Sequence, residues 1–260
     1  PDGFALVSSM TNICSAVAPS DVNCTQFVDC LLGGTLGGYF SDGAPFMNSY
    51  VRNNAPDNWT SVFLTDSKII STLYTNISMV ESYYETSGDI VPLAVANVIK
   101  VAAMDRVTDT YGPIPYSAIG FEGAVKTPYD SQEEVYNKFF EELAEARQTL
   151  LDNSTSVMSP LVDKVYGGDV TNWIRFANSL QLRLAMRISY ANPALAKQKA
   201  EEAVNPANGG VIETNDQNAT WKNYQTSTNS MRTAIMYNSH DSRPSAEIAC
   251  YLNGFHDPRL

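Results

Sequence analysis

A short polar segment in the N-terminal third of the chain carries side chains suited to binding a sugar. Arg52, Asn54 and Trp59 lie together in the segment 52–59. The C–H faces of sugar rings stack on indole rings, and sugar hydroxyls pair with amide and guanidinium groups. We therefore predict a ligand-binding loop that contains these three residues. In the competing interpretation, Trp59 is the first core residue of the helix that follows.

A second polar stretch, beyond residue 211, carries the aromatic residues Tyr224 and Tyr237. Helical periodicity fades there, which is typical of a loop. A phenol ring in a loop can stack on a ligand and donate a hydrogen bond. Tyr237 completes the predicted ligand-binding set with Arg52, Asn54 and Trp59.

The sequence carries no pattern that predicts catalysis, a metal site or a cofactor. The nucleophile-elbow, zinc-protease and phosphate-loop motifs are absent. Both histidines, His240 and His256, precede an aspartate, and such pairs are ordinary surface or capping residues. No C-x-x-C pair accompanies them. We therefore expect a protein that is not an enzyme.

Three of the four cysteines, Cys14, Cys24 and Cys30, lie close together in the sequence. In an oxidising compartment two of them could form a disulfide. Alternatively, they are small buried apolar residues. The sequence leaves both interpretations open.

The charge balance excludes nucleic acid as a partner. The chain has 17 Lys and Arg against 28 Asp and Glu, a formal net charge of −11, and its cations form no cluster. Binding to phosphate backbones or to anionic lipid requires clustered cations. No apolar run reaches the ~18 residues that a membrane-spanning helix needs.

Apolar residues at intervals of three and four predict a succession of helices. The expected ranges are 59–84, 92–108, 131–152, 171–188, 194–204 and 245–252. Short connections between them favour antiparallel pairs, and hence a mainly α fold. Helix pairing alone does not choose between a bundle, a solenoid and an α/α barrel.

Four sequence blocks resemble the SusD/RagB family, in the family's order. They are the segment 105–117 with YGPIPY, the segment 127–136 (TPYDSQEEVY), the segment 163–188 with GGDVTNWIRFANSLQLRLAMR, and the segment 245–260 with its final DPRL. The resemblance covers residues 60–260, whereas residues 1–58 match no family pattern. Within these blocks we expect Asn178, Arg183 and Arg187 to cross-link helices.

The resemblance implies a mainly α, SusD-like fold with tetratricopeptide-like helix pairs and irregular ligand-binding loops. Residues 1–260 would form the N-terminal portion of a single SusD-like domain, with a variable segment at 1–58, a helical scaffold at 59–260 and a C-terminal half beyond the sequence. The protein would be a surface-exposed outer-membrane lipoprotein whose lipid anchor lies outside this chain. It would bind an oligosaccharide and deliver it to a SusC-like TonB-dependent transporter.

Three alternatives compete with this interpretation. A RagB-like lipoprotein would bind peptides through backbone hydrogen bonds. An α/α-barrel carbohydrate-active enzyme would share the helix pairing, and a purely structural subunit of the transporter complex would bind no ligand.

Overall fold

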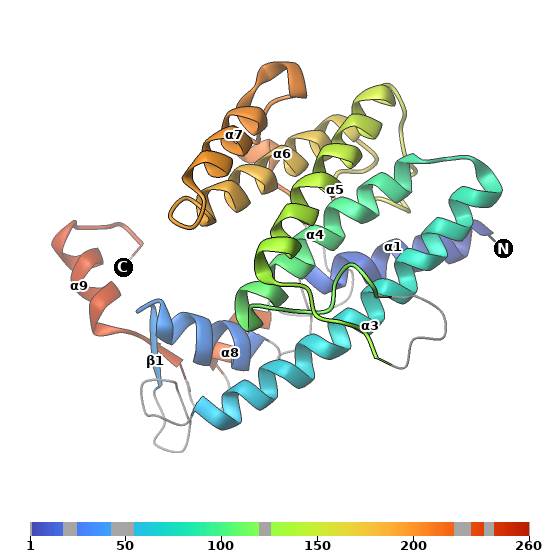
Figure 1. Ribbon diagram of the computed structural model, residues 1–260. Helices are drawn as coiled ribbons and strands as arrows, with labels where there is room; N and C mark the ends of the chain where they lie inside the picture. Colours follow the sequence, from blue (N-terminus) through green and yellow to red (C-terminus); the bar gives the residue numbers. More distant parts are fainter. Residues whose placement is uncertain are drawn as a thin grey trace. The chain divides into compact units, whose positions relative to one another are not determined.

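The computed structural model describes residues 2–17, 25–42, 55–119, 126–220, 230–236 and 242–259, and most of these are helical (Figure 1). The predicted mainly α fold is confirmed. The chain divides into two compact units, Pro1–Val17 with Ile70–Lys222 and Ala18–Ile69 with Asn223–Leu260. That residues 1–260 belong to one larger domain remains a prediction.

The first unit is a layered array of helices. Its elements are α1 (Asp2–Val17), the C-terminal part of α3 (Ala55–Ser87), α4 (Val91–Tyr111), α5 (Gln132–Asp152), α6 (Val170–Arg187), α7 (Pro193–Val204) and the short turns η3 (Pro206–Asn208) and η4 (Asn215–Gln217). From α4 to α7 each helix packs against the next and runs antiparallel to it (Figure 1). The predicted helix pairs are therefore present.

Helix α4 lies at the centre of this unit, because it packs against α1 on one side and α5 on the other. Apolar residues of α4 are buried on all its sides, including Val98 and Val101. A helix that is apolar all round is typical of such a central position. From α1, the side chains of Leu6, Met10 and Ile13 complete this core.

Local hydrogen bonds fix the ends of α4 and α5. Ser131 and Glu134 form a capping box at the start of α5. Helix α4 ends at Tyr111 rather than at Thr108, because Gly112 adopts φ 76° and donates its N–H to the Thr108 carbonyl. Glycine reaches this left-handed region without steric cost.

The connection between α4 and α5 is closed at its base by an isolated antiparallel bridge. Ile114 and Asp130 exchange two backbone hydrogen bonds of 3.2 and 2.9 Å. The Asp130 carboxylate also accepts hydrogen bonds from the backbone N–H groups of Tyr116 and Ser117. The two ends of this connection are thus held together independently of the residues between them.

The second unit contains η1 (Thr25–Gly34), β1 (Phe40–Asp42), the start of α3, α8 (Ser230–Met236), β2 (Ser242–Pro244) and α9 (Ala246–Gly254). Strands β1 and β2 pair antiparallel, with Phe40 opposite Pro244. Helix α8 packs against η1, where the Thr25 hydroxyl donates to Ser230 over 3.0 Å. After α9, His256 adopts φ 51° at the helix end, in agreement with a capping role.

Cys14 and Cys30 behave as buried apolar residues. Cys14 is a buried free thiol, and the buried Cys30 thiol lies 3.3 Å from the Met231 sulfur. Burial, with a smaller effect of Asp163, raises the pKa of Cys14 to about 12, so it stays protonated. Cys24 lies outside the described residues. Within the described ranges no helix combines the length and apolarity needed to cross a bilayer.

Candidate functional site

A groove of about 560 Å³ opens in the helical unit, where the ends of α4 and α6 meet the beginnings of α5 and α7. Asp109, Tyr136 and Arg187 form its floor. We name this feature the α5–α7 groove. Its volume lies within the range of pockets that bind small ligands.

The floor of the α5–α7 groove is a network of charged and polar groups. The Arg187 guanidinium forms an ion pair with Asp109 and lies 3.8 Å from the Asp105 carboxylate. The Tyr136 hydroxyl donates to Asp109 over 2.7 Å and is 3.4 Å from Asp105. Arg183 lies 3.9 Å from Asp105. The predicted cross-linking by Arg183 and Arg187, which joins α6 to α4, is confirmed.

Burial dominates the electrostatics of this floor. It raises the pKa of Asp105 above its ordinary value of 3.8, and the guanidinium groups of Arg187 and Arg183 offset this only in part. Burial and the nearby Asp105 also raise the pKa of Tyr136. The tyrosine therefore remains protonated, and its single hydroxyl proton is donated mainly to Asp109, the nearer of the two carboxylates.

We expect the raised pKa of Asp105 to make the protein less stable as pH increases. A carboxyl group whose folded pKa lies above its unfolded value binds its proton more tightly in the folded state, so stability falls as pH rises from about 4 through the folded pKa. Asp105→Asn should remove this slope. Urea unfolding at a series of pH values measures how the free energy of unfolding changes with pH. Asp152→Asn, at an exposed position, is the control. Identical slopes for wild type and Asp105→Asn would contradict the assignment.

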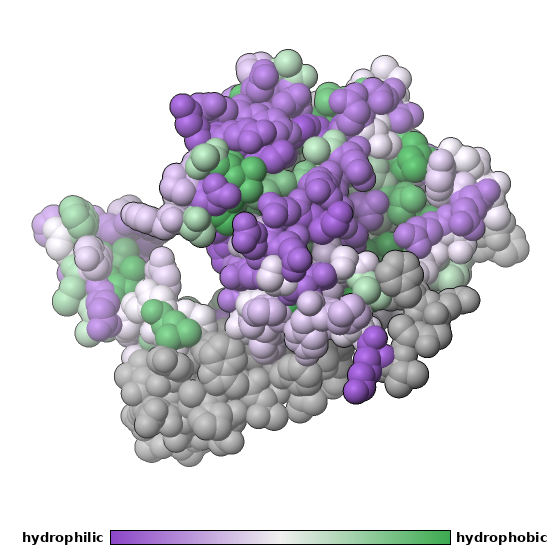
Figure 2. All heavy atoms as spheres, viewed as in Figure 1, coloured by the Kyte–Doolittle hydropathy of each residue, from purple (hydrophilic) through white to green (hydrophobic). Residues whose placement is uncertain are grey.

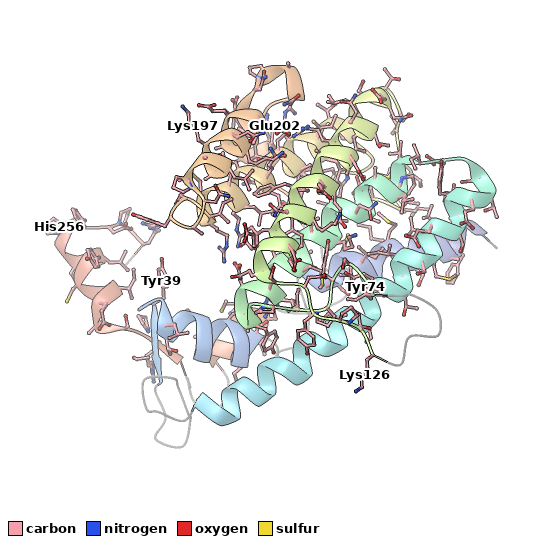
Figure 3. The ribbon with its side chains drawn as sticks, in the orientation of Figure 1. Tyr39, Tyr74, Lys126, Lys197, Glu202 and His256 are labelled. Atoms are coloured by element: carbon pink, nitrogen blue, oxygen red, sulfur yellow. The ribbon has the colours of Figure 1, made fainter. Side chains whose placement is uncertain are left out.

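A second polar network joins α5, α6 and α7 inside the helical unit. Arg147 donates to the side-chain oxygens of Asn178 (3.3 Å) and Gln181 (3.0 Å) and forms an ion pair of 2.5 Å with Glu202. Asn178 donates to the backbone carbonyls of Asn208 and Gly210. Figure 3 shows Glu202 on the side of α7 toward α6, whereas Lys197 extends outward. The predicted cross-linking role of Asn178 is confirmed.

The loop before α6 is organised by one buried aspartate. The Asp163 carboxylate accepts hydrogen bonds from three backbone N–H groups and from the Trp173 indole. Gly168 has φ 99°, and a Cβ there would lie 2.0 Å from the Met158 carbonyl oxygen. Asp163 therefore holds this loop against the first turn of α6.

The predicted ligand-binding set falls largely outside the described residues. Helix α3 begins at Ala55, so Trp59 lies in a helix, and the prediction that it belongs to a loop is wrong. Arg52, Asn54 and Tyr237 lie outside the described residues. Sequence reasoning missed the groove, because its residues come from four helices and share no motif.

The described residues offer no group of three His, Cys, Asp or Glu side chains that could hold a metal ion. The groove instead presents amides, carboxylates and an aliphatic wall. These groups bind ligands by hydrogen bonding and apolar contact.

Comparison with known families decides the relationship. A SusD-like family model, described as SusD and RagB outer membrane lipoprotein, matches residues 1–260. The chain belongs to the SusD-like family. The match includes the segment 1–58, in which the sequence alone showed no family pattern.

Solved SusD-like structures resemble the chain over nearly its whole length. A SusD homolog from Bacteroides uniformis has 51% identity and a TM-score of 0.91, with 99% of this chain and 54% of that chain covered. A homolog from Bacteroides ovatus has 34% identity and a TM-score of 0.83, with 100% and 51% covered.

A third solved structure has a stated ligand. A chitin-binding SusD homolog from Flavobacterium johnsoniae has 30% identity and a TM-score of 0.80, with 98% of this chain and 53% of that chain covered. The present SusD-like chain thus spans about half the length of these structures. No match was found among curated proteins.

Proposed function

We propose that this SusD-like chain is the N-terminal part of a surface-exposed outer-membrane lipoprotein that binds oligosaccharides and is not an enzyme. The similarity to a chitin-binding SusD homolog, at 30% identity over 98% of this chain, is the observation that carries the proposal. The family description, SusD and RagB outer membrane lipoprotein, supports the location. We propose a SusC-like TonB-dependent transporter as the partner that receives the ligand.

The proposed oligosaccharide site contains Arg52, Asn54, Trp59 and Tyr237. Trp59 belongs to the first turns of α3, directly after the polar segment that holds Arg52 and Asn54. The segment 52–59 thus combines an indole with amide and guanidinium groups in its sequence, the combination that suits a sugar ring.

Titration calorimetry of the full-length protein with chito-oligosaccharides tests this site. We expect Trp59→Ala to weaken binding about tenfold, since losing one stacking contact costs about 1.4 kcal/mol. Tyr190→Ala, which removes an aromatic side chain that is 99% exposed, is the control and should bind normally.

Other outcomes would favour the competing functions. Binding of peptides but not of oligosaccharides would replace the proposal with a RagB-like function. New reducing ends after incubation with polysaccharides would show an enzyme. Co-purification of the transporter without any ligand binding would favour a structural subunit.

A further inference from the structure

We propose that the α5–α7 groove is a second binding site, for a short extended peptide segment that carries a lysine or arginine beside an aliphatic residue. This proposal rests on other residues than the proposed oligosaccharide site and does not depend on it. Its polar wall, its apolar wall and its charge each support this assignment.

The polar wall comes from the first turns of α5. Glu133 and Asn137 lie four residues apart, so they share one helix face at the groove, and both are exposed. Within the described part of the chain, neither side chain has a hydrogen-bond or ion-pair partner. Both are therefore available to a ligand.

Two further amides line the same groove. The Gln132 side chain donates to the Thr108 carbonyl over 2.9 Å, and the Asn192 side-chain oxygen accepts from the Leu195 N–H over 3.2 Å. These bonds fix both amides in place and use only one end of each. The Gln132 oxygen and the Asn192 nitrogen can pair with the N–H and C=O groups of an extended peptide.

The apolar wall lies opposite, at the turn from α6 to α7. It consists of Ile188, Ala191 and Leu195. Figure 2 shows an apolar area beside α7 within a surface that is otherwise mostly hydrophilic. An aliphatic side chain of the ligand would lose contact with water by packing against this wall.

The charge of the groove selects a basic ligand. Arg187 is already paired with Asp109 and faces Asp105, and the unpaired charge at the rim is the Glu133 carboxylate. The formal net charge of the chain, −11, adds long-range attraction for cations and repulsion for anions.

The groove suits a peptide better than a sugar. Tyr136 is the aromatic residue among those that line it, and only 6% of its surface is exposed. Its ring packs against Phe139 and Phe140, at centroid distances of 5.7 and 6.5 Å. With so little of its surface exposed, Tyr136 offers no open ring face on which a sugar could stack.

Fluorescence anisotropy with the full chain and a labelled, end-capped pentapeptide tests the proposal. The probe has a central lysine flanked by leucines, and the matched probe has glutamate in place of lysine. We expect the lysine probe to bind at least tenfold more tightly, because glutamate meets a like charge at the rim. Added salt should reduce the difference in affinity between the lysine and the glutamate probe, because it screens their interaction with the Glu133 carboxylate.

Three variants locate the binding. Glu133→Lys should weaken binding of the lysine probe about tenfold by replacing attraction with repulsion, and Ala191→Phe should abolish it by filling the groove. Glu145→Lys is the matched control and should bind normally: Glu145 is exposed on the same helix, about 18 Å further along its axis. Circular dichroism checks that each variant is folded.

Equal affinity for the two probes would overturn the proposal, and so would equal effects of Glu133→Lys and Glu145→Lys. Displacement of the peptide by chito-oligosaccharides would assign the groove to a sugar instead. The two proposals can fail separately, because Glu133→Lys should leave binding at the Trp59 site unchanged.

Discussion

Asp163→Ala should lower the free energy of unfolding by about 4 kcal/mol, because it leaves several buried donors without an acceptor. One carboxylate oxygen of Asp163 accepts from the backbone N–H groups of Val165 (3.0 Å) and Tyr166 (3.1 Å). The other accepts from the N–H of Gly168 and the indole N–H of Trp173, both at 2.8 Å. Asp163 is only 2% exposed, so water cannot replace it without opening the loop. Urea unfolding followed by circular dichroism measures the loss.

Two other variants separate this effect from a simple loss of charge. Asp152→Ala removes an exposed carboxylate at the end of α5 and should change stability by less than about 0.5 kcal/mol. Trp173→Phe keeps a ring but removes one of the four donors, so it should cost less than Asp163→Ala. Equal stability of Asp163→Ala and Asp152→Ala would show that the loop is held by other contacts.

Arg147→Met should destabilise the helical unit by about 3 kcal/mol at neutral pH. The variant keeps an apolar stem of similar length, but the oxygens of Gln181 and Asn178 lose a donor. Glu202 loses its ion pair with Arg147 and retains the one with Lys199. Lys197→Met on the exposed face of α7 is the matched control and should be almost neutral. Thermal and urea unfolding measure both variants.

The loss of stability caused by Arg147→Met should depend on pH in a definite direction. Burial opposes ionisation of Glu202, but hydrogen bonds from Arg147 and Lys199 outweigh it and lower the pKa below 4.5. A depressed carboxyl pKa stabilises the folded state above the unfolded value, and this stability is lost as pH falls through the folded pKa. The difference between wild type and Arg147→Met should therefore shrink below about pH 4.5. A constant difference would contradict a role for this ion pair.

Local signals in the sequence predicted the helical scaffold well. Ser131 and Glu134 mark the start of α5, and Asn192 with Pro193 marks the start of α7. These features depend on residues a few positions apart, so their geometry follows from the chain itself. The cross-links from Asn178 and Arg187 were predictable because the family resemblance pointed to them.

Long-range features were not predictable in this way. The apolar periodicity of helix α1 is weak. Its apolar side chains are buried by contacts with α4, which is distant in the sequence. Strands β1 and β2 pair across about two hundred residues, and each has only three residues. The α5–α7 groove likewise arises from packing, since Glu133 and Ala191 are unremarkable surface residues until the helices meet.

The bridge between Ile114 and Asp130 allows the connection between α4 and α5 to change in length with little effect on the stability of these two helices. Backbone hydrogen bonds already hold the two ends of this loop together. Extra residues placed between Ser117 and Asp130 would therefore lengthen the loop without separating its ends. Doubling the length of such a loop costs only about 0.6 kcal/mol of closure entropy. This connection is therefore a natural insertion point for an epitope tag or a reporter domain, and a place where related chains can diverge in size at little cost.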